Sequence, residues 1–256
     1  MATSTTTSAA AAAVIASVAA ASIAVHVLRR RRVRAQPNSP TVSSSTEIPH
    51  LPHTATAEQV AVAIRTEGVC IIERALDQEA LSKLRTRLQD IEPRKLQNRR
   101  AHRWEHVHSP EAPPLAELAD LEPIRIAVRA LLGPKTYLEK AGLVVSHPGA
   151  EAQRWHMDTP HLFSVGVHLP PHSLTVFVPM CDLVPSNGPT EFQLGTHVKA
   201  NLVVAQRHAL ACCPSGSLVV YDPRIMHRGG PNGGTSERPL IYLTFSRIWY
   251  RDTLNP

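Results

Sequence analysis

Two short stretches of this chain carry side chains that could act together chemically. The first is QRWHMD, residues 153–158, in which His156 and Asp158 stand two residues apart. In an extended strand these two side chains point to the same face, so an imidazole and a carboxylate would lie side by side. Such a pair can be a structural hydrogen bond, a catalytic dyad or two thirds of a metal site.

The second stretch is MHRGGPNGGTSERP, residues 226–239, and it adds a histidine and an arginine. His227 lies 69 residues after Asp158 and is expected on a short strand that could face the first one. Two histidines and one carboxylate on one face of an octahedral ion leave the opposite positions open, as in non-haem Fe(II) oxygenases. Arg238 follows His227 by eleven residues, enough for the chain to return beside it, and its guanidinium could hold a carboxylate through two hydrogen bonds.

These motifs resemble those of the phytanoyl-CoA dioxygenase family of Fe(II)- and 2-oxoglutarate-dependent oxygenases. A third stretch, NGPTEFQLGTH at residues 187–197, is similar to a further segment of that family. It departs from the family pattern at Leu194, where proline is usual, and at Thr196, where serine is usual. The resemblance covers roughly residues 55–250, and neither departure involves a metal ligand.

The resemblance implies a role for each of these residues. His156, Asp158 and His227 would be the metal ligands and the catalytic centre, and Arg238 would bind 2-oxoglutarate. Thr175, on a predicted strand after the first motif, is a further candidate for contact with 2-oxoglutarate. Fe(II) and the co-substrate 2-oxoglutarate are thus expected, with O2 and a small-molecule substrate as partners. Asp158 favours hydroxylation, because related halogenases have a small residue there that leaves room for a halide.

Two other functions stay open at the level of sequence. One is a facial-triad iron oxygenase that does not use 2-oxoglutarate, and the other is a catalytically silent jelly-roll binding protein. The intact triad argues against the silent protein, because loss of activity usually shows as a lost ligand. The main hypothesis is hydroxylation of an aliphatic carbon in a small organic or lipid-like substrate, whose identity the fold does not fix.

The elements that would position the motifs fall into a helical part followed by a strand-rich part. Helical spacing of apolar residues predicts helices over 56–68, 76–91 and 115–133. Runs rich in Val, Leu, Thr, Phe and Tyr predict strands over 136–146, 174–180, 216–222 and 238–250. This order predicts a mainly β fold with flanking helices, a sandwich or barrel with helices outside it. The family resemblance implies a cupin-like double-stranded β-helix, or jelly roll.

One stretch looks like a second metal site but lacks ligands. AHRWEHVH, residues 101–108, places His102 and His106 four residues apart, as on one face of a helix. No carboxylate or third ligand follows at a convincing spacing, so a polar loop or helix face is expected.

Charge and cysteine content narrow the class of protein. The net charge of +6 depends on an arginine block at residues 29–34 that supplies five of the 27 basic residues. Without that block, 22 basic residues face 21 acidic ones, so a nucleic-acid partner is not expected. The four cysteines show no metal or redox spacing and are expected to be buried, reduced thiols.

The first 45 residues differ from the rest of the chain. They are predicted to be a membrane anchor or targeting segment plus a linker, with the dioxygenase domain over 46–256. Residues 9–28 are weakly apolar and precede the arginine block, so an anchor would leave the catalytic domain on the cytoplasmic side. The acid-free, Ser/Ala/Arg-rich composition also suits an organelle transit peptide. The chain ends in TLNP rather than in a peroxisomal signal of the Ser-Lys-Leu type.

Overall fold

A computed structural model describes residues 46–98, 102–163, 168–198 and 207–253. The predicted anchor or targeting segment, with the apolar residues 9–28, lies outside the described residues and stays a prediction. Within the described ranges, no helix combines the length and apolar character that a membrane crossing requires.

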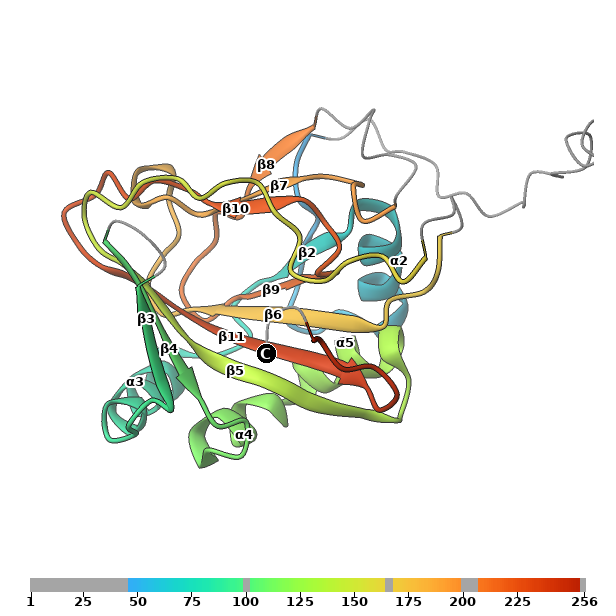
Figure 1. The fold of residues 1–256 in the computed structure, drawn as a ribbon, viewed down its shortest axis with the longest axis horizontal. Helices are drawn as coiled ribbons and strands as arrows, with labels where there is room; N and C mark the ends of the chain where they lie inside the picture. Colours follow the sequence, from blue (N-terminus) through green and yellow to red (C-terminus); the bar gives the residue numbers. More distant parts are fainter. Residues whose placement is uncertain (1–45, 99–101, 164–167, 199–206, 254–256) are drawn as a thin grey trace, which may run out of the picture. The chain divides into compact units, whose positions relative to one another are not determined.

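An eight-stranded sheet forms the framework of the described domain (Figure 1). The strands lie in the order β1-β2-β9-β6-β11-β5-β4-β3 and neighbours run antiparallel, except for the parallel pair β1 and β2. Their bounds are β1 His50–Leu51, β2 Val69–Ile72, β3 Lys95–Asn98, β4 Arg103–His108, β5 Thr136–Ser146, β6 Ser173–Pro179, β9 Leu218–Tyr221 and β11 Arg238–Arg247.

A smaller sheet lies over the inner face of the large one. Its order is β10-β7-β8, and its strands are β7 Thr190–Gln193, β8 His208–Leu210 and β10 His227–Gly229. Apolar residues from both sheets form one buried cluster, with Phe192 and Leu194 on one side and Val219 and Tyr221 on the other. Two sheets closed over a shared core, with helices outside, confirm the predicted mainly β jelly-roll class.

Local sequence sets the ends of the helices. Thr56 caps helix α2 (Ala57–Glu67) by accepting a hydrogen bond from the Gln59 backbone, while the Gln59 side chain bonds back to Thr56. Gly68 ends the helix in the left-handed region at φ 84°, and β2 begins at the next residue. Asp77 caps helix α3 (Gln78–Gln89) by accepting a hydrogen bond from the backbone N–H of Ala80. The remaining helices are α4 Pro113–Ala119, α5 Glu122–Leu132 and the 3-10 turn η1 Pro185–Asn187.

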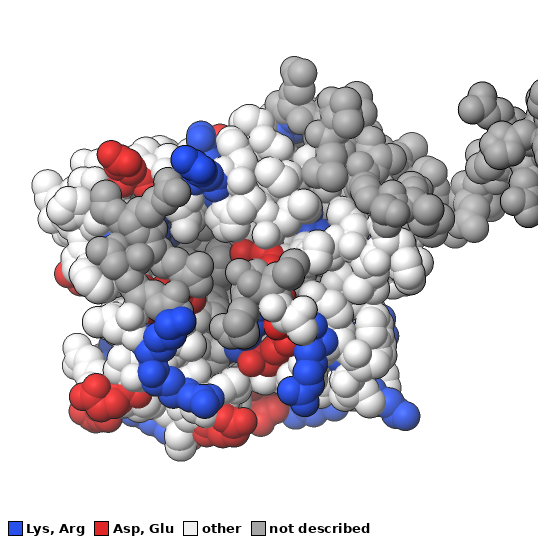
Figure 2. All heavy atoms as spheres, viewed as in Figure 1, with Lys and Arg blue, Asp and Glu red and all other residues white. Residues whose placement is uncertain are grey.

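The surface charge is mixed. On the face shown in Figure 2, Lys and Arg are interspersed with Asp and Glu among the described residues and form no continuous basic area. This agrees with the near balance of charge that remains once the N-terminal arginine block is set aside.

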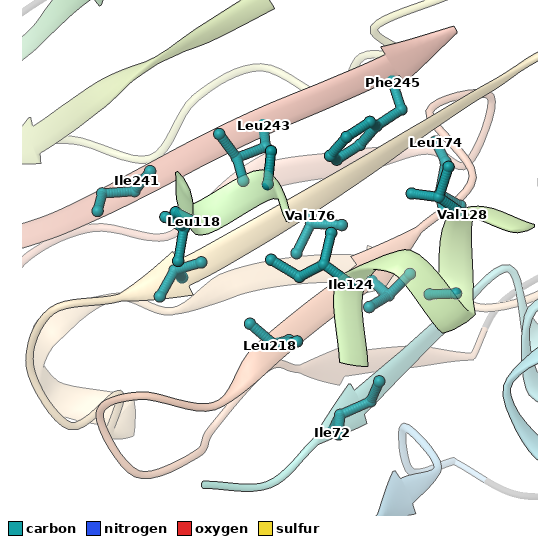
Figure 3. Packing of buried hydrophobic residues seen from close by; sticks show 14 of the residues in the cluster. Ile72, Leu118, Ile124, Val128, Leu174, Val176, Leu218, Ile241, Leu243 and Phe245 are labelled. Atoms are coloured by element: carbon teal, nitrogen blue, oxygen red, sulfur yellow. The ribbon is translucent and has the colours of Figure 1, made fainter. Parts of the chain in front are cut away.

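The helices cover the outer face of the large sheet (Figure 3). Leu118, Ile124 and Val128 of α4 and α5 belong to one buried cluster with residues of β6 and β11 such as Val176 and Leu243. Burial of each such side chain stabilises the fold by about 1.5–3 kcal/mol. Because side chains alternate along a strand, the residues between them on β6 and β11 face the opposite side of the sheet. That inner side carries the candidate site.

Two local predictions were wrong. The helix expected over 115–133 is two helices, because Pro123 has no N–H to donate to the carbonyl of Ala119. The stretch 101–108, expected to be a loop or a helix face, contains strand β4 paired with β3 and β5. It lacks apolar alternation because two of its buried side chains are charged, Arg103 and Glu105.

The four cysteines are free thiols, but the expected burial holds for only two of them. Cys70 and Cys213 are buried, whereas Cys181 and Cys212 are only partly so. Burial raises the pKa of the Cys70 thiol to about 12, so this group stays protonated and inert at neutral pH.

Candidate metal centre

The two histidines are neighbours at the edge of the small sheet. His156 forms a single antiparallel bridge with His227: its N–H donates to the His227 carbonyl at 3.0 Å, and the reverse bond is 2.9 Å. The ring centroids are 4.5 Å apart. Of the stretch QRWHMD only His156 is paired in this way, and His227 lies directly beside it on β10.

Asp158 completes a group of three possible ligands. One carboxylate oxygen, Oδ1, lies 3.7 Å from Nε2 of His156, and Oδ2 lies 3.5 Å from Nε2 of His227. One ligand atom from each residue can be chosen so that all three lie within 4.8 Å of one another. No other group of three His, Cys, Asp or Glu side chains in the described ranges meets this spacing. The chemistry and spacing suit a single metal ion.

Both imidazoles are held in the tautomer that a metal needs. Nδ1 of His156 lies 2.8 Å from the carbonyl of Arg154, and Nδ1 of His227 lies 3.0 Å from the carbonyl of Ile225. A carbonyl can only accept, so each Nδ1 carries the hydrogen and each Nε2 keeps a free lone pair. Burial also lowers the pKa of His227, which favours its neutral form.

The turn between β9 and β10 joins the H-x-D segment to the second histidine. The carbonyl of Pro223 accepts hydrogen bonds from the backbone N–H groups of Asp158 and Thr159, at 2.9 and 3.2 Å. Arg224 fixes this turn through a two-point contact with Asp222, Nε to Oδ1 at 2.9 Å and Nη2 to Oδ2 at 2.6 Å. Both partners are buried, so their pairing offsets the cost of removing them from water.

The segment 187–197 stabilises the same turn through hydrogen bonds of Thr196. The Thr196 hydroxyl donates to the carbonyl of Gln193 at 2.7 Å and accepts from the N–H of Met226 at 2.8 Å. Met226 precedes His227, so this hydroxyl fixes the approach to the second histidine. Threonine in place of serine keeps the hydroxyl, which explains why the departure from the family pattern is tolerated.

Arg238 lies in the same cavity as the three candidate ligands. This cavity has a volume of about 320 Å³. The Arg238 side chain is 2% exposed, and its Nε and Nη1 have no hydrogen-bond partner in the described structure. Burial, with a smaller effect of Arg103, lowers its pKa to about 10. An unpaired guanidinium is costly to bury, so this end of the cavity is suited to an anion.

A second buried arginine of the cavity, Arg103, was not identified from the sequence. Arg103 on β4 and Arg238 on β11 are both paired in register with Ser146 of the intervening strand β5. Its Nη2 donates to the carbonyl of Gly230 at 2.8 Å, so it also holds the loop that leads to Arg238. No local pattern identified it, because it precedes the H-x-D segment by 53 residues in a stretch not expected to be a strand.

Thr175 also faces the cavity, but its contacts lead towards Asp158. Its hydroxyl lies 3.2 Å from that of Thr244, and the residue pairs in register with Tyr221 of β9. Tyr221 in turn donates to Oδ2 of Asp158 at 2.8 Å. The sequence did not single out Tyr221, and the predicted contact of Thr175 with 2-oxoglutarate stays a prediction.

Comparisons with known proteins agree with this geometry. A family model described as phytanoyl-CoA dioxygenase (PhyH) matches residues 64–240. The solved structure of HygX from Streptomyces hygroscopicus, with nickel, 2-oxoglutarate and hygromycin B bound, is 16% identical with a TM-score of 0.64 and covers 77% of this chain and 89% of that chain.

Two enzymes of nogalamycin biosynthesis have a similar fold. The alpha-ketoglutarate-dependent epimerase SnoN is 15% identical with a TM-score of 0.62, over 75% of this chain and 82% of that chain. The carbocyclase SnoK is 16% identical with a TM-score of 0.62, over 75% of this chain and 86% of that chain. At these identities the likeness is one of fold.

Proposed function

This chain belongs to the phytanoyl-CoA dioxygenase family and is thus an iron- and 2-oxoglutarate-dependent oxygenase, and we propose that it hydroxylates an aliphatic carbon of a small organic substrate. In this reaction a C–H bond, O2 and 2-oxoglutarate give C–OH, succinate and CO2. One oxygen atom enters the substrate and the other enters succinate. The main support is one cavity that holds both a His-Asp-His group and an unpaired, buried guanidinium.

The three ligand residues would hold the iron. Nε2 of His156, Nε2 of His227 and a carboxylate oxygen of Asp158 form the donor set that Fe(II) takes in such oxygenases. Iron and 2-oxoglutarate, when bound, supply the activation of O2. The protein fixes the donors, through backbone contacts at both Nδ1 atoms, and places them in a cavity. Asp158 also leaves no gap for a halide, which favours hydroxylation over halogenation.

Arg238 would take the distal carboxylate of 2-oxoglutarate. Its Nε and Nη1 are buried without a partner in the described structure, and a carboxylate at the end of the guanidinium would accept a charge-assisted hydrogen bond from Nη1. A nearby anion would also offset the like charge of Arg103. This supports a 2-oxoglutarate enzyme over an iron oxygenase that works without this co-substrate.

The rest of the cavity favours a compact substrate with polar groups. Lys140 and Asp252 form an ion pair at 2.8 Å and line the cavity together with Glu105. Apolar contacts come from Val144, Met157, Phe177 and Leu240. A long acyl chain would bring these charged groups against hydrocarbon, which is unfavourable. Of the two substrate classes expected from the sequence, the small organic molecule is favoured over the lipid-like one.

Succinate formation tests the proposal without knowledge of the substrate. Metal-free protein is supplied with Fe(II), 2-oxoglutarate and O2, and succinate is measured with and without each component. We expect slow, uncoupled succinate release that needs all three components and is lost in Asp158→Ala. A silent binding protein would give no succinate with any combination. An oxygenase of the other iron class would consume O2 with a substrate pool but never require 2-oxoglutarate.

A further inference from the structure

Tyr221 holds a fixed position beside the candidate metal ligands. It is the last residue of β9 and is fully buried, and its hydroxyl donates to Oδ2 of Asp158 at 2.8 Å. Three aromatic rings surround it, with centroids 4.9 Å away for Phe177, 5.3 Å for Phe192 and 5.0 Å for His227. Such packing leaves the ring little freedom, so the core sets the position of its hydroxyl oxygen.

The Tyr221 hydroxyl belongs to a row of hydroxyls that crosses three neighbouring strands. Tyr221 of β9 pairs in register with Thr175 of β6, which pairs with Thr244 of β11. Thr175 and Tyr221 line the same cavity, and the Thr175 hydroxyl lies 3.2 Å from the Thr244 hydroxyl. An ionised carboxylate can only accept, so the Tyr221 proton points to Asp158.

Asp158 has two oxygens that compete for the role of ligand. Oδ1 lies 3.7 Å from Nε2 of His156, while Oδ2 lies 3.5 Å from Nε2 of His227. The residue is in a bend rather than a strand, and its side chain is 38% exposed, against full burial of Tyr221. A carboxylate that bound through both oxygens would occupy two of the six positions of an octahedral ion. Only two positions would then remain for 2-oxoglutarate and O2, which together need three.

We propose that Tyr221 is a positioning residue that engages Oδ2 of Asp158 and so presents this carboxylate to the metal through Oδ1 alone. The inference rests on the proposed function, because it presupposes metal binding at the His-Asp-His group. In this proposal Thr175, in the same row of hydroxyls, helps Tyr221 to keep its orientation towards Asp158.

The test is calorimetric titration of Co(II) into the metal-free full chain, in the absence of 2-oxoglutarate. Loss of a group that orients a ligand typically weakens metal binding by about 10- to 100-fold, and we expect Tyr221→Phe to fall in that range. Tyr137→Phe is the matched control, since it removes a hydroxyl that donates to the Tyr250 carbonyl at 2.9 Å and does not line this cavity. The control should bind Co(II) like the wild type.

A double-mutant cycle separates positioning from general damage to the fold. If Tyr221 acts through Asp158, then Tyr221→Phe should cause no further loss of Co(II) affinity in an Asp158→Ala background. Thr175→Val should weaken Co(II) binding in the same direction as Tyr221→Phe but by less. Thermal unfolding of the metal-free variants reports separately on stability.

Two results would overturn the inference while leaving the proposed function intact. One is a Tyr221→Phe variant with wild-type Co(II) affinity, and the other is an equal loss of affinity in both backgrounds of the cycle. A wild-type protein that binds no Co(II) would instead overturn the proposed function, and this inference with it.

Discussion

The two faces of the large sheet use the same strands for different purposes. On β6 and β11 the side chains of Val176 and Leu243 are fully buried within the helix-covered cluster, whereas their neighbours Thr175 and Thr244 line the cavity. Stability and chemistry are thus separated by a single step along the chain. Substitutions one residue apart should therefore have effects of different kinds, and the following experiments test that separation.

The largest expected effect is on the inner face, at the metal. Asp158→Ala removes one of three ligands, so succinate formation with saturating Fe(II) and 2-oxoglutarate should fall by about 100-fold or more. The side chain contributes nothing to the apolar core, but its loss leaves the buried Tyr221 hydroxyl without its acceptor, so the metal-free variant should lose about 1–3 kcal/mol of stability. A variant that keeps the wild-type rate of succinate formation would contradict the assignment of Asp158.

Adjacent positions on β11 provide the most direct comparison of the two faces. Leu243→Ala leaves a void in the outer core and should lower the free energy of unfolding by about 2–5 kcal/mol. Thr244→Val removes one hydroxyl from the inner row and should lower it by no more than about 1 kcal/mol. Urea unfolding of the two metal-free variants measures both free energies of unfolding. Equal losses of stability would contradict the separation of stability and chemistry between the two faces.

Arg238→Ala should act on the co-substrate rather than on the metal. Removing one partner of a buried charge pair typically costs about 2–5 kcal/mol, so the 2-oxoglutarate concentration for half-maximal succinate formation should rise about 30-fold or more. Co(II) affinity without 2-oxoglutarate should stay unchanged. Arg238→Lys keeps the charge but loses the two-point contact, so its effect should be intermediate. Arg87→Ala, at an exposed position on α3, is the control.

A further prediction concerns the pH dependence of stability and a histidine that lines no part of the cavity. His197 is buried, with Nε2 bonded to the Arg65 carbonyl, and burial lowers its pKa to about 4. The unfolded residue has a pKa of about 6.5, so on acidification the unfolded chain binds a proton that the folded chain excludes. Stability should therefore fall between about pH 6.5 and pH 4, by roughly 1–3 kcal/mol for this group.

Urea unfolding of the metal-free protein at several pH values checks this sign. The variant His197→Asn should lose less stability than the wild type between about pH 6.5 and pH 4, whatever its stability at neutral pH. A wild-type protein that gains stability from pH 6.5 to pH 4 would contradict the prediction.

The sequence predicted the parts of this molecule that depend on short-range patterns. The spacing of four residues marked them as candidates for the site, namely His156, Asp158, His227 and Arg238. The structure gathers all four around one cavity. The main strands and the α2 and α3 helices follow from the periodicity of their apolar residues.

What the sequence missed depends on contacts between distant segments. Arg103 is buried on a strand whose charged side chains hide the usual alternation. Tyr221 ends the run LVVY, which looks like ordinary core, and its partner Asp158 is 63 residues away. The position of His156 directly beside His227 required the fold itself.

The most direct test is an anaerobic crystal structure of the protein with Fe(II) and 2-oxoglutarate. We predict one metal ion bonded to Nε2 of His156, Nε2 of His227 and a single oxygen of Asp158, with the distal carboxylate of 2-oxoglutarate on Arg238. A metal ion bound elsewhere, or 2-oxoglutarate held away from Arg238, would contradict the account.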